Sequence, residues 1–222
     1  MSESPWKSEL HWRLDGRQDR SSKTQNKLLD AAESLFFLDG YDATSVADIA
    51  KKSGCSIGAV YHHFKDKKAI AFALFDRMTS EYAVTANEAC SPERWTGATI
   101  VDILKGYIHF SIVNNRERPG FKIAALEAVR LDPSLGKHFQ KLQIQLHKGL
   151  QKLLLERRDE IGHPDPTFAS AYALDLLTAL LRVRFDPAAN NAQLTKLNEK
   201  EFRQHAISLC LSVLQIERKI TS

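Results

Sequence analysis

Residues 44–64 are Thr-Ser-Val-Ala-Asp-Ile-Ala-Lys-Lys-Ser-Gly-Cys-Ser-Ile-Gly-Ala-Val-Tyr-His-His-Phe, and they contain the signals for two short helices joined by a tight turn. Ser45 can cap the first helix, and Asp48 three residues later completes a capping box. Gly54 can take the left-handed backbone conformation that ends a helix without a Cβ clash. Ser56 can then cap the second helix. This arrangement predicts a helix-turn-helix, a motif that pushes its second helix into the major groove of DNA.

Apolar residues on both sides of the motif continue the helical pattern. One face of an amphipathic helix before the motif is marked by Leu28, Ala31, Ala32, Leu35 and Phe36. After the motif, Asp66 can cap a helix whose apolar positions include Ile70, Leu74, Phe75 and Met78. Within the second helix of the motif, Val60 and Phe64 share one apolar stripe. We therefore expect a three-helix head joined to a long fourth helix over residues 21 to about 89.

These residues resemble the N-terminal domain of the TetR family of one-component bacterial transcriptional regulators. The matching positions are Leu28-Leu29-Asp30-Ala31-Ala32-Glu33-Ser34-Leu35-Phe36, Gly40-Tyr41, Thr44-Ser45-Val46, Asp48-Ile49-Ala50, Gly54, Gly58, Tyr61-His62-His63-Phe64 and Lys67. They cover roughly residues 24–75 in register and without a gap. The remainder of the chain matches the family only in its helical character.

The resemblance implies a set of DNA-contacting positions in the motif. They are Thr44, Ser45, Ser56, Ile57, Gly58, Ala59, Tyr61, His62, His63 and Lys67. Thr44 and Ser45 would donate to phosphate, Tyr61 and His63 would contact the backbone, and Lys67 would pair with phosphate. His62 is a weaker candidate.

The positions expected to face base edges are Ser56, Ile57, Gly58 and Ala59, with Lys52 or Ser53 nearby, and this set has no Arg, Asn or Gln. Ile57 and Ala59 can instead touch thymine methyl groups, so we expect thymine at the matching operator positions, with some shape readout.

Composition and charge agree with a DNA-binding protein but do not identify one. The chain has 222 residues, of which 43% are apolar and 26% charged, enough for one small and one medium domain. The net charge is +4, and residues 51–68 alone carry five lysines against one acid, Asp66. Such a patch can neutralise phosphates. A solvated lysine face is the alternative, and the surrounding motif favours phosphate binding.

The three cysteines, Cys55, Cys90 and Cys210, have neither a short pairing nor a metal-type spacing. An odd count at wide separation suits reduced thiols in a cytoplasm. Cys55, beside the turn, is interpreted as a small semi-buried filler rather than a redox sensor. No segment resembles a signal peptide, and no apolar run approaches the roughly 18 residues of a membrane span. We expect a cytoplasmic protein, associated with the bacterial nucleoid if the resemblance holds.

Residues 1–20 stand apart from the motif as an N-terminal basic extension. They carry Arg13, Arg17, Arg20, Trp6 and Trp12 without a clean periodicity. They form either a basic arm that contacts DNA or a loosely ordered terminus. We expect the DNA-binding domain over residues 21–81 and a ligand-binding and dimerisation domain over residues 82–222.

The sequence of the larger domain predicts helices separated by proline and glycine, and it shows no strand-type alternation. We therefore expect an all-α fold class. Its last two helices, residues 168–184 and about 200–218, are apolar over most of their circumference and must be buried on more than one side. The resemblance implies that they pair with those of a second copy as a four-helix bundle. A core helix in a monomer is the alternative. A symmetric dimer places two recognition helices about 34 Å apart and predicts a near-palindromic operator.

The resemblance also implies a small-molecule pocket between the middle helices. Candidate residues that could orient a ligand there are Tyr107, His109, Glu127, Arg130 and His147. For each of them, the alternative to ligand binding is a structural or surface role.

The function predicted from these features is regulation rather than catalysis. The sequence has no Gly-rich phosphate loop, no Gly-x-Ser-x-Gly and no His-Glu-x-x-His, so we expect no enzyme, cofactor or metal. A metal sensor using His138 and His147 is disfavoured, because nine residues place two side chains poorly on one helical face. We predict a ligand-responsive DNA-binding transcriptional regulator, a repressor released from its operator when a small molecule binds. The alternative is a helical small-molecule or protein-binding module with only non-specific DNA affinity.

Overall fold

The computed structural model describes residues 20–117, 119–186, 189 and 192–217. Every regular element in these ranges is an α-helix or a short 3-10 helix, which confirms the predicted all-α class. The described residues form two compact units, residues 20–85 with 114–143 and residues 86–113 with 144–217. Residues 1–19 of the predicted N-terminal extension lie outside the described residues, and the predicted domain boundary at residue 81 stays a prediction.

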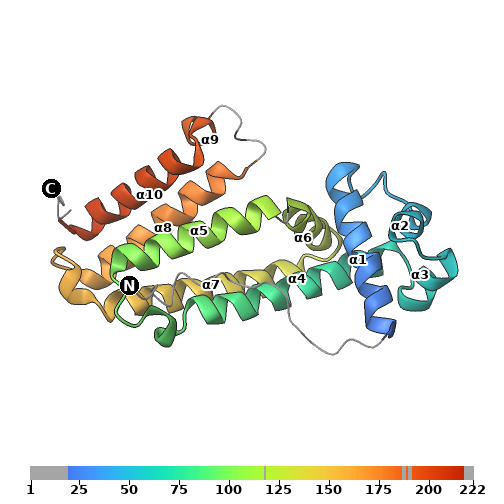
Figure 1. The fold of residues 1–222 in the computed structure, drawn as a ribbon, viewed down its shortest axis with the longest axis horizontal. Helices are drawn as coiled ribbons and strands as arrows, with labels where there is room; N and C mark the ends of the chain where they lie inside the picture. The colour runs from blue at the N-terminus through green and yellow to red at the C-terminus, as the bar shows by residue number, and fades with distance from the viewer. Residues whose placement is uncertain (1–19, 118, 187–188, 190–191, 218–222) are drawn as a thin grey trace, which may run out of the picture. The chain divides into compact units, whose positions relative to one another are not determined.

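The first unit contains the predicted helix-turn-helix. Its helices are α1 (Arg20–Leu38), α2 (Val46–Ser53), α3 (Ile57–His63), the first part of α4 (Lys67–Ala89) and α6 (Pro119–Leu131). In chain order α1 packs against α2 and α2 against α3, as Figure 1 shows. These bounds confirm the three-helix head and the long fourth helix predicted from the sequence.

One apolar core holds this head unit together. The fully buried side chains are Leu28, Ala32 and Phe36 from α1, Ile49 from α2, and Ile70, Ala71, Leu74 and Met78 from α4. The predicted apolar face of α1 is therefore the face that is buried. α6 also packs against α1, and its Ala124 is fully buried in the same core. The hydrophobic core of the head unit thus includes a helix that comes after both α4 and α5 in the chain.

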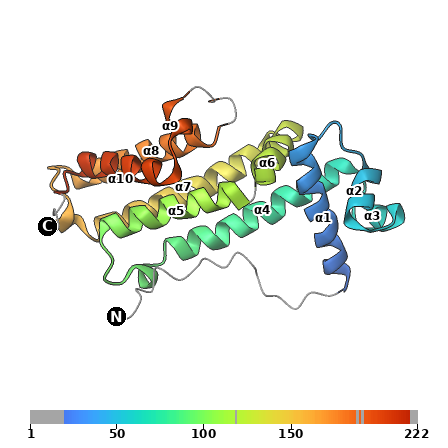
Figure 2. The same cartoon turned by 45° about the horizontal axis from the view of Figure 1, so that its top comes forward.

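The second unit is built around a pair of C-terminal helices. α8 (Pro166–Arg184) and α10 (Glu199–Leu214) lie side by side, with the short α9 (Gln193–Lys196) between them in the chain (Figures 1 and 2). Helices α5 (Ile100–Glu117) and α7 (Ser134–Leu155) contribute residues to both units. The 3-10 helices η2 (Pro92–Trp95) and η3 (Arg158–Glu160) belong to the second unit.

Arg157, just after α7, joins three segments of the second unit. Its guanidinium donates to the carbonyl oxygens of Trp95 and Ala98 at 2.6 Å each and of Leu153 at 2.8 Å. A planar group with five donors suits this task, because the carbonyls lie in different directions around it.

The last helix ends four residues earlier than its predicted end near residue 218. Gln215 takes the left-handed conformation, with φ of 54°, and its amide donates back to Leu211 and Ser212. The amides of Gly162 and His163 donate to the carbonyl of Leu214 at 3.0 and 3.3 Å. A Cβ on Gly162 would stand 2.5 Å from the carbonyl oxygen of Gln215, so only glycine fits this approach. The loop before α8 therefore fixes the end of α10.

The pair α8 and α10 buries one apolar face and leaves another exposed. The buried side chains of these helices include Ala169, Ala173 and Leu177 of α8 and Phe202, Ala206 and Cys210 of α10, and Cys210 Sγ lies 3.6 Å from the carbonyl oxygen of Ala173. Phe168 and Tyr172 of α8 are 55% and 45% exposed and stack with ring centroids 5.5 Å apart, and Leu209 of α10 is 38% exposed. Large apolar side chains therefore remain uncovered on both helices.

The cysteines are free thiols in sheltered positions. Burial raises the pKa of Cys90 to about 11 and that of Cys210 to about 12, so both stay protonated at neutral pH. Cys55 is half-buried against the head core, which agrees with its interpretation as a small filler. None of the helices in the described ranges has the length and hydropathy needed to cross a membrane.

Candidate nucleic-acid interface

The turn before α2 forms the predicted capping box. The amide of Ser45 donates to Oδ2 of Asp48 at 2.9 Å, and the amide of Asp48 donates to Oγ of Ser45 at 3.1 Å. The hydrogen bonds from Ser45 hold the pKa of the Asp48 carboxyl below its usual range. At the other end, Gly54 has φ of 69° and its amide donates to Ala50 and Lys51. Both ends of α2 are thus fixed by the residues expected from the sequence.

Replacing Ser45 with alanine is expected to lower the free energy of unfolding by about 1 kcal/mol, because the amide of Asp48 loses its acceptor. Ser45→Thr keeps the hydroxyl and should recover most of the loss. Urea unfolding followed by circular dichroism measures both variants, and equal stabilities for Ser45→Ala and wild type would contradict the capping role.

The pH dependence of this cap follows from the lowered pKa of Asp48. Its contribution to stability is present above the carboxyl pKa of the unfolded chain, about 3.9, and is lost as pH falls through the lower folded value. The difference between wild type and Ser45→Ala should therefore shrink in strong acid.

Helix α3 has one buried side and one exposed side. Its N-cap Ser56 accepts from the amide of Ala59 at 3.1 Å, and Val60 is 1% exposed in the head core. On the other side, Ile57 and Tyr61 are 51% and 57% exposed, and Gly58 and His62 are also exposed. Ala59 and His63 are half-buried. A short, firmly capped helix therefore presents the predicted base-facing tip to solvent.

Exposed lysines precede and follow this helix in the sequence. Lys51 and Lys52 lie in the last turn of α2, and Lys65 and Lys68 flank the start of α4. All four are exposed. Their charges are free to approach a polyanion, as the sequence predicts for a phosphate-binding patch.

Two predicted phosphate contacts, Thr44 and Lys67, make hydrogen bonds inside the head instead of pointing to solvent. Thr44 is 3% exposed, and its hydroxyl donates to the carbonyl of Gly40 at 2.8 Å. Lys67 Nζ donates to the carbonyl oxygens of Tyr41, Asp42 and Thr44. Their predicted phosphate contacts stay untested, and each would compete with internal hydrogen bonds. No pattern in the sequence indicated that these two side chains hold the turn over residues 40–45.

Comparison with known proteins finds a family match within the head. A family model described as "Bacterial regulatory proteins, tetR family" matches residues 28–74, the segment that contains α2, α3, the second half of α1 and the start of α4. Residues 28–74 therefore form a segment of the TetR family type.

Two curated TetR-type relatives are similar over the N-terminal part. The Transposon Tn10 TetC protein of Escherichia coli is 30% identical over 103 residues, which is 45% of this chain and 50% of that protein. The HTH-type transcriptional repressor Rv1474c of Mycobacterium tuberculosis is 36% identical over 70 residues, 32% of this chain and 37% of that protein. The chain thus spans half or less of the length of these relatives.

The likeness in fold extends over nearly the whole chain. A structure of SmeT in complex with triclosan has a TM-score of 0.62 and 22% identity, and the match covers 90% of this chain and 95% of SmeT. SmeT is the repressor of the Stenotrophomonas maltophilia multidrug efflux pump SmeDEF. At this identity the likeness establishes the shared TetR-type fold.

The five candidate ligand-binding residues lie in different environments in the structure. The hydroxyl of Tyr107 hydrogen-bonds the side chains of Thr178 and Ser111, and burial raises its pKa. His109 is exposed and its Nδ1 lies 2.9 Å from Arg203. His147 Nε2 lies 3.7 Å from Asp175 Oδ1. Tyr107, His109 and His147 belong to the second unit.

Glu127 and Arg130 belong to the head unit instead. Arg130 Nε donates to Glu127 at 2.7 Å, and Arg130 Nη2 donates to Asp42 of the 40–45 turn at 3.2 Å. The Arg130 guanidinium also lies 5.8 Å from the centre of the Tyr41 ring. These contacts join α6 to the turn that precedes α2.

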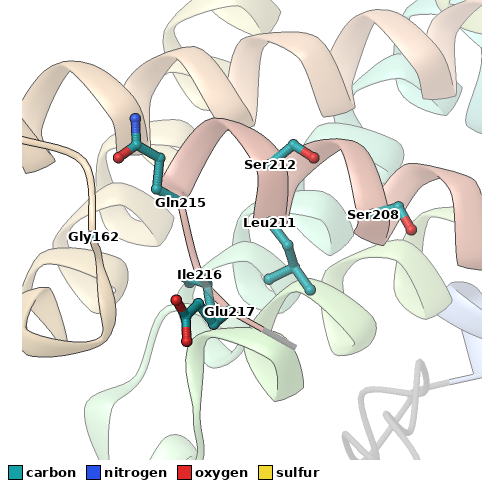
Figure 3. Close-up of a pocket in the computed structure, with 7 residues that line it drawn as sticks. All are labelled: Gly162, Ser208, Leu211, Ser212, Gln215, Ile216 and Glu217. Atoms are coloured by element: carbon teal, nitrogen blue, oxygen red, sulfur yellow. The ribbon is translucent and has the colours of Figure 1, made fainter. Parts of the chain in front are cut away.

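A surface cavity of about 620 Å³ lies at the end of α10, shown in Figure 3. Its lining residues are Gly162, Ser208, Leu211, Ser212, Gln215, Ile216 and Glu217. None of the five predicted ligand-binding residues lines this cavity, so it is not the pocket that the sequence analysis expected between the middle helices.

Proposed function

We propose that the chain is a ligand-responsive transcriptional regulator that binds double-stranded DNA through α3. The observation that carries this proposal is the exposed tip of that helix, Ser56, Ile57 and Gly58 with Tyr61, which is set on a capped motif and flanked by exposed lysines. A helix presented in this way suits the major groove, which is wide enough to admit it.

The proposed contacts divide into two kinds. Tyr61, His62 and His63, together with Lys51, Lys52, Lys65 and Lys68, would contact phosphates and set the register, as would the N-terminal amides of α2 and α3 beside Ser45 and Ser56. Ile57 and Ala59 would touch thymine methyl groups, and Gly58 would let the backbone approach the bases. This division predicts strong salt dependence and modest direct readout of sequence.

We further propose that two copies pair through α8 and α10. The exposed stack of Phe168 and Tyr172 and the exposed Leu209 support this, because large apolar side chains on neighbouring helices are suited to a partner surface. Two heads related by a twofold axis would bind a near-palindromic operator. Sedimentation equilibrium should give a dimer for wild type and a weaker dimer for Phe168→Ser with Tyr172→Ser.

The proposed regulation is a population shift by a small molecule. The ligand would bind better to the form whose heads do not match the operator spacing, so DNA is released and transcription resumes. The complex of SmeT with triclosan supports a small-molecule effector for a protein of this fold. We also propose that the protein is cytoplasmic and associated with the nucleoid, because its operator DNA would be there.

Selection of bound duplexes from a random-sequence library tests this function. The full chain, at about 0.15 M salt where non-specific contacts are weak, should enrich a near-palindromic site and protect it in footprinting. Thymine should occupy the positions facing Ile57 and Ala59, and G·C pairs there would contradict the proposed readout. No enrichment, with binding that falls equally for all sequences as salt rises, would support the alternative module with non-specific DNA affinity.

A further inference from the structure

The ammonium group of Lys67, the first residue of α4, is held inside the head. Its Nζ donates to the carbonyl oxygens of Tyr41 at 2.8 Å, Thr44 at 2.9 Å and Asp42 at 3.3 Å. Nζ also lies 4.3 Å from the centre of the Tyr41 ring. A lysine ammonium has three N–H donors, so these three carbonyls account for all of them. A phosphate could bind Nζ only by displacing one of these acceptors.

The three carbonyls belong to one short segment, the turn that connects α1 to α2. Within this turn, the Thr44 hydroxyl donates to Gly40, and the Thr44 amide donates to Tyr41 at 3.3 Å. Ser45, the next residue, is the N-cap of α2. Carbonyls that converge on one cation are held in a fixed arrangement, and this arrangement sets where the cap of α2 begins.

The same turn is contacted from α6. Arg130 donates to Asp42, and its guanidinium lies near the Tyr41 ring that Lys67 also approaches. The Arg130 and Asp42 side chains are 54% and 84% exposed, so solvent screens this pair. Lys67, with three acceptors and only partial exposure, is the stronger constraint.

We propose that Lys67 is a positioning residue for DNA binding, which holds the 40–45 turn and through it α2, and that it is not a phosphate ligand. This inference rests on the proposed function, because it assigns a role within the same DNA-binding head. It separates Lys67 from the neighbouring exposed lysines 65 and 68, which retain the proposed phosphate role.

Two substitutions separate the positioning role from phosphate binding. Lys67→Met removes the ammonium and keeps much of the side-chain length. Lys67→Arg keeps the charge, but a planar guanidinium fork cannot point its donors at three carbonyls that converge on one atom. Arginine is, however, a good phosphate ligand. The matched control is Lys65→Met, two residues earlier and exposed.

The first readout is the salt dependence of affinity for the selected operator duplex. If Lys67 positions the turn, both Lys67 variants lose about tenfold or more in affinity at fixed salt, and the slope of log K against log salt stays at the wild-type value. Lys65→Met should reduce the slope by about 0.9 per head, or about 1.8 for a dimer. A reduced slope in Lys67→Met with near-normal affinity in Lys67→Arg would overturn the inference and restore the phosphate role.

The second readout needs no DNA, so it still tests the inference if the proposed function fails. Amide hydrogen exchange at Thr44, Ser45 and Asp48 should be faster in both Lys67 variants than in wild type and in Lys65→Met. Unchanged exchange in the Lys67 variants would overturn the inference. If selection enriches no operator while exchange changes as expected, the proposed function fails and the structural role of Lys67 stands.

Discussion

Replacing Phe36 with alanine is expected to lower the free energy of unfolding by about 3–5 kcal/mol, the usual cost of removing a fully buried aromatic ring. Phe36 is 0% exposed at the centre of the head core and makes an edge contact with Tyr41, with ring centroids 5.1 Å apart. Because domains are stable by only about 5–15 kcal/mol, a loss of this size removes a large share of the stability of the head. DNA binding should weaken with it.

The adjacent residue supplies the control. Phe37 is also a phenylalanine in α1 but is 44% exposed, so Phe37→Ala should cost much less than Phe36→Ala. Urea unfolding of the two variants, followed by circular dichroism, measures the difference. Similar losses for both would mean that the core of the head is not packed as described.

Replacing Gly58 with glutamate should abolish operator binding while the fold stays intact. A Cβ at this position meets only Oγ of Ser56 at 3.8 Å, an ordinary contact, so the head accommodates a side chain there. The carboxylate would stand at the tip of α3, where the proposed DNA complex brings phosphates and base edges close. Like charge at such a site costs several kcal/mol, which corresponds to an affinity loss of about 100-fold or more.

Gly58→Gln separates charge from size in this test. Glutamine has nearly the shape of glutamate without its charge, and both substitutions remove a glycine from a helix and should keep or slightly raise stability. We expect Gly58→Gln to bind DNA clearly better than Gly58→Glu in gel-shift titrations. Equal affinities for the two variants and wild type would show that the tip of α3 does not face DNA.

The sequence predicted the head because its signals are local. The capping box of Ser45 and Asp48, the turn at Gly54 and the cap at Ser56 each depend on residues three or four positions apart. Helical spacing likewise identified the buried face of α1, since a regular apolar stripe packs against whatever core is available. The exposed tip of α3 could be predicted because Val60 and Phe64 mark the buried stripe of that helix, which leaves Ile57 on the other side.

The features that the sequence analysis missed depend on distant contacts. Lys67 bonds carbonyls that lie 23 to 26 positions earlier, and Arg130 bonds Asp42, 88 positions away. Thr44 is polar and was expected to face phosphate, but a hydrogen bond four positions back to Gly40 lets it be buried. The end of α10 at Leu214 was placed too late, because amides from the loop at Gly162 and His163 hold it. Apart from the local bond of Thr44 to Gly40, these contacts join residues that are far apart in the sequence, so no local pattern encodes them.

The burial of Ala124 within the head core has a consequence for protein engineering. A fragment that stops after α4 would leave α1 without α6, the helix that packs against it, and would remove Ala124 from the core of the head. Hybrid biosensors are made by grafting the DNA-binding head of one regulator onto the sensor body of another. For this chain the transplanted piece should carry α6 (Pro119–Leu131) as well, or the recipient must supply a helix with a small residue where Ala124 stands.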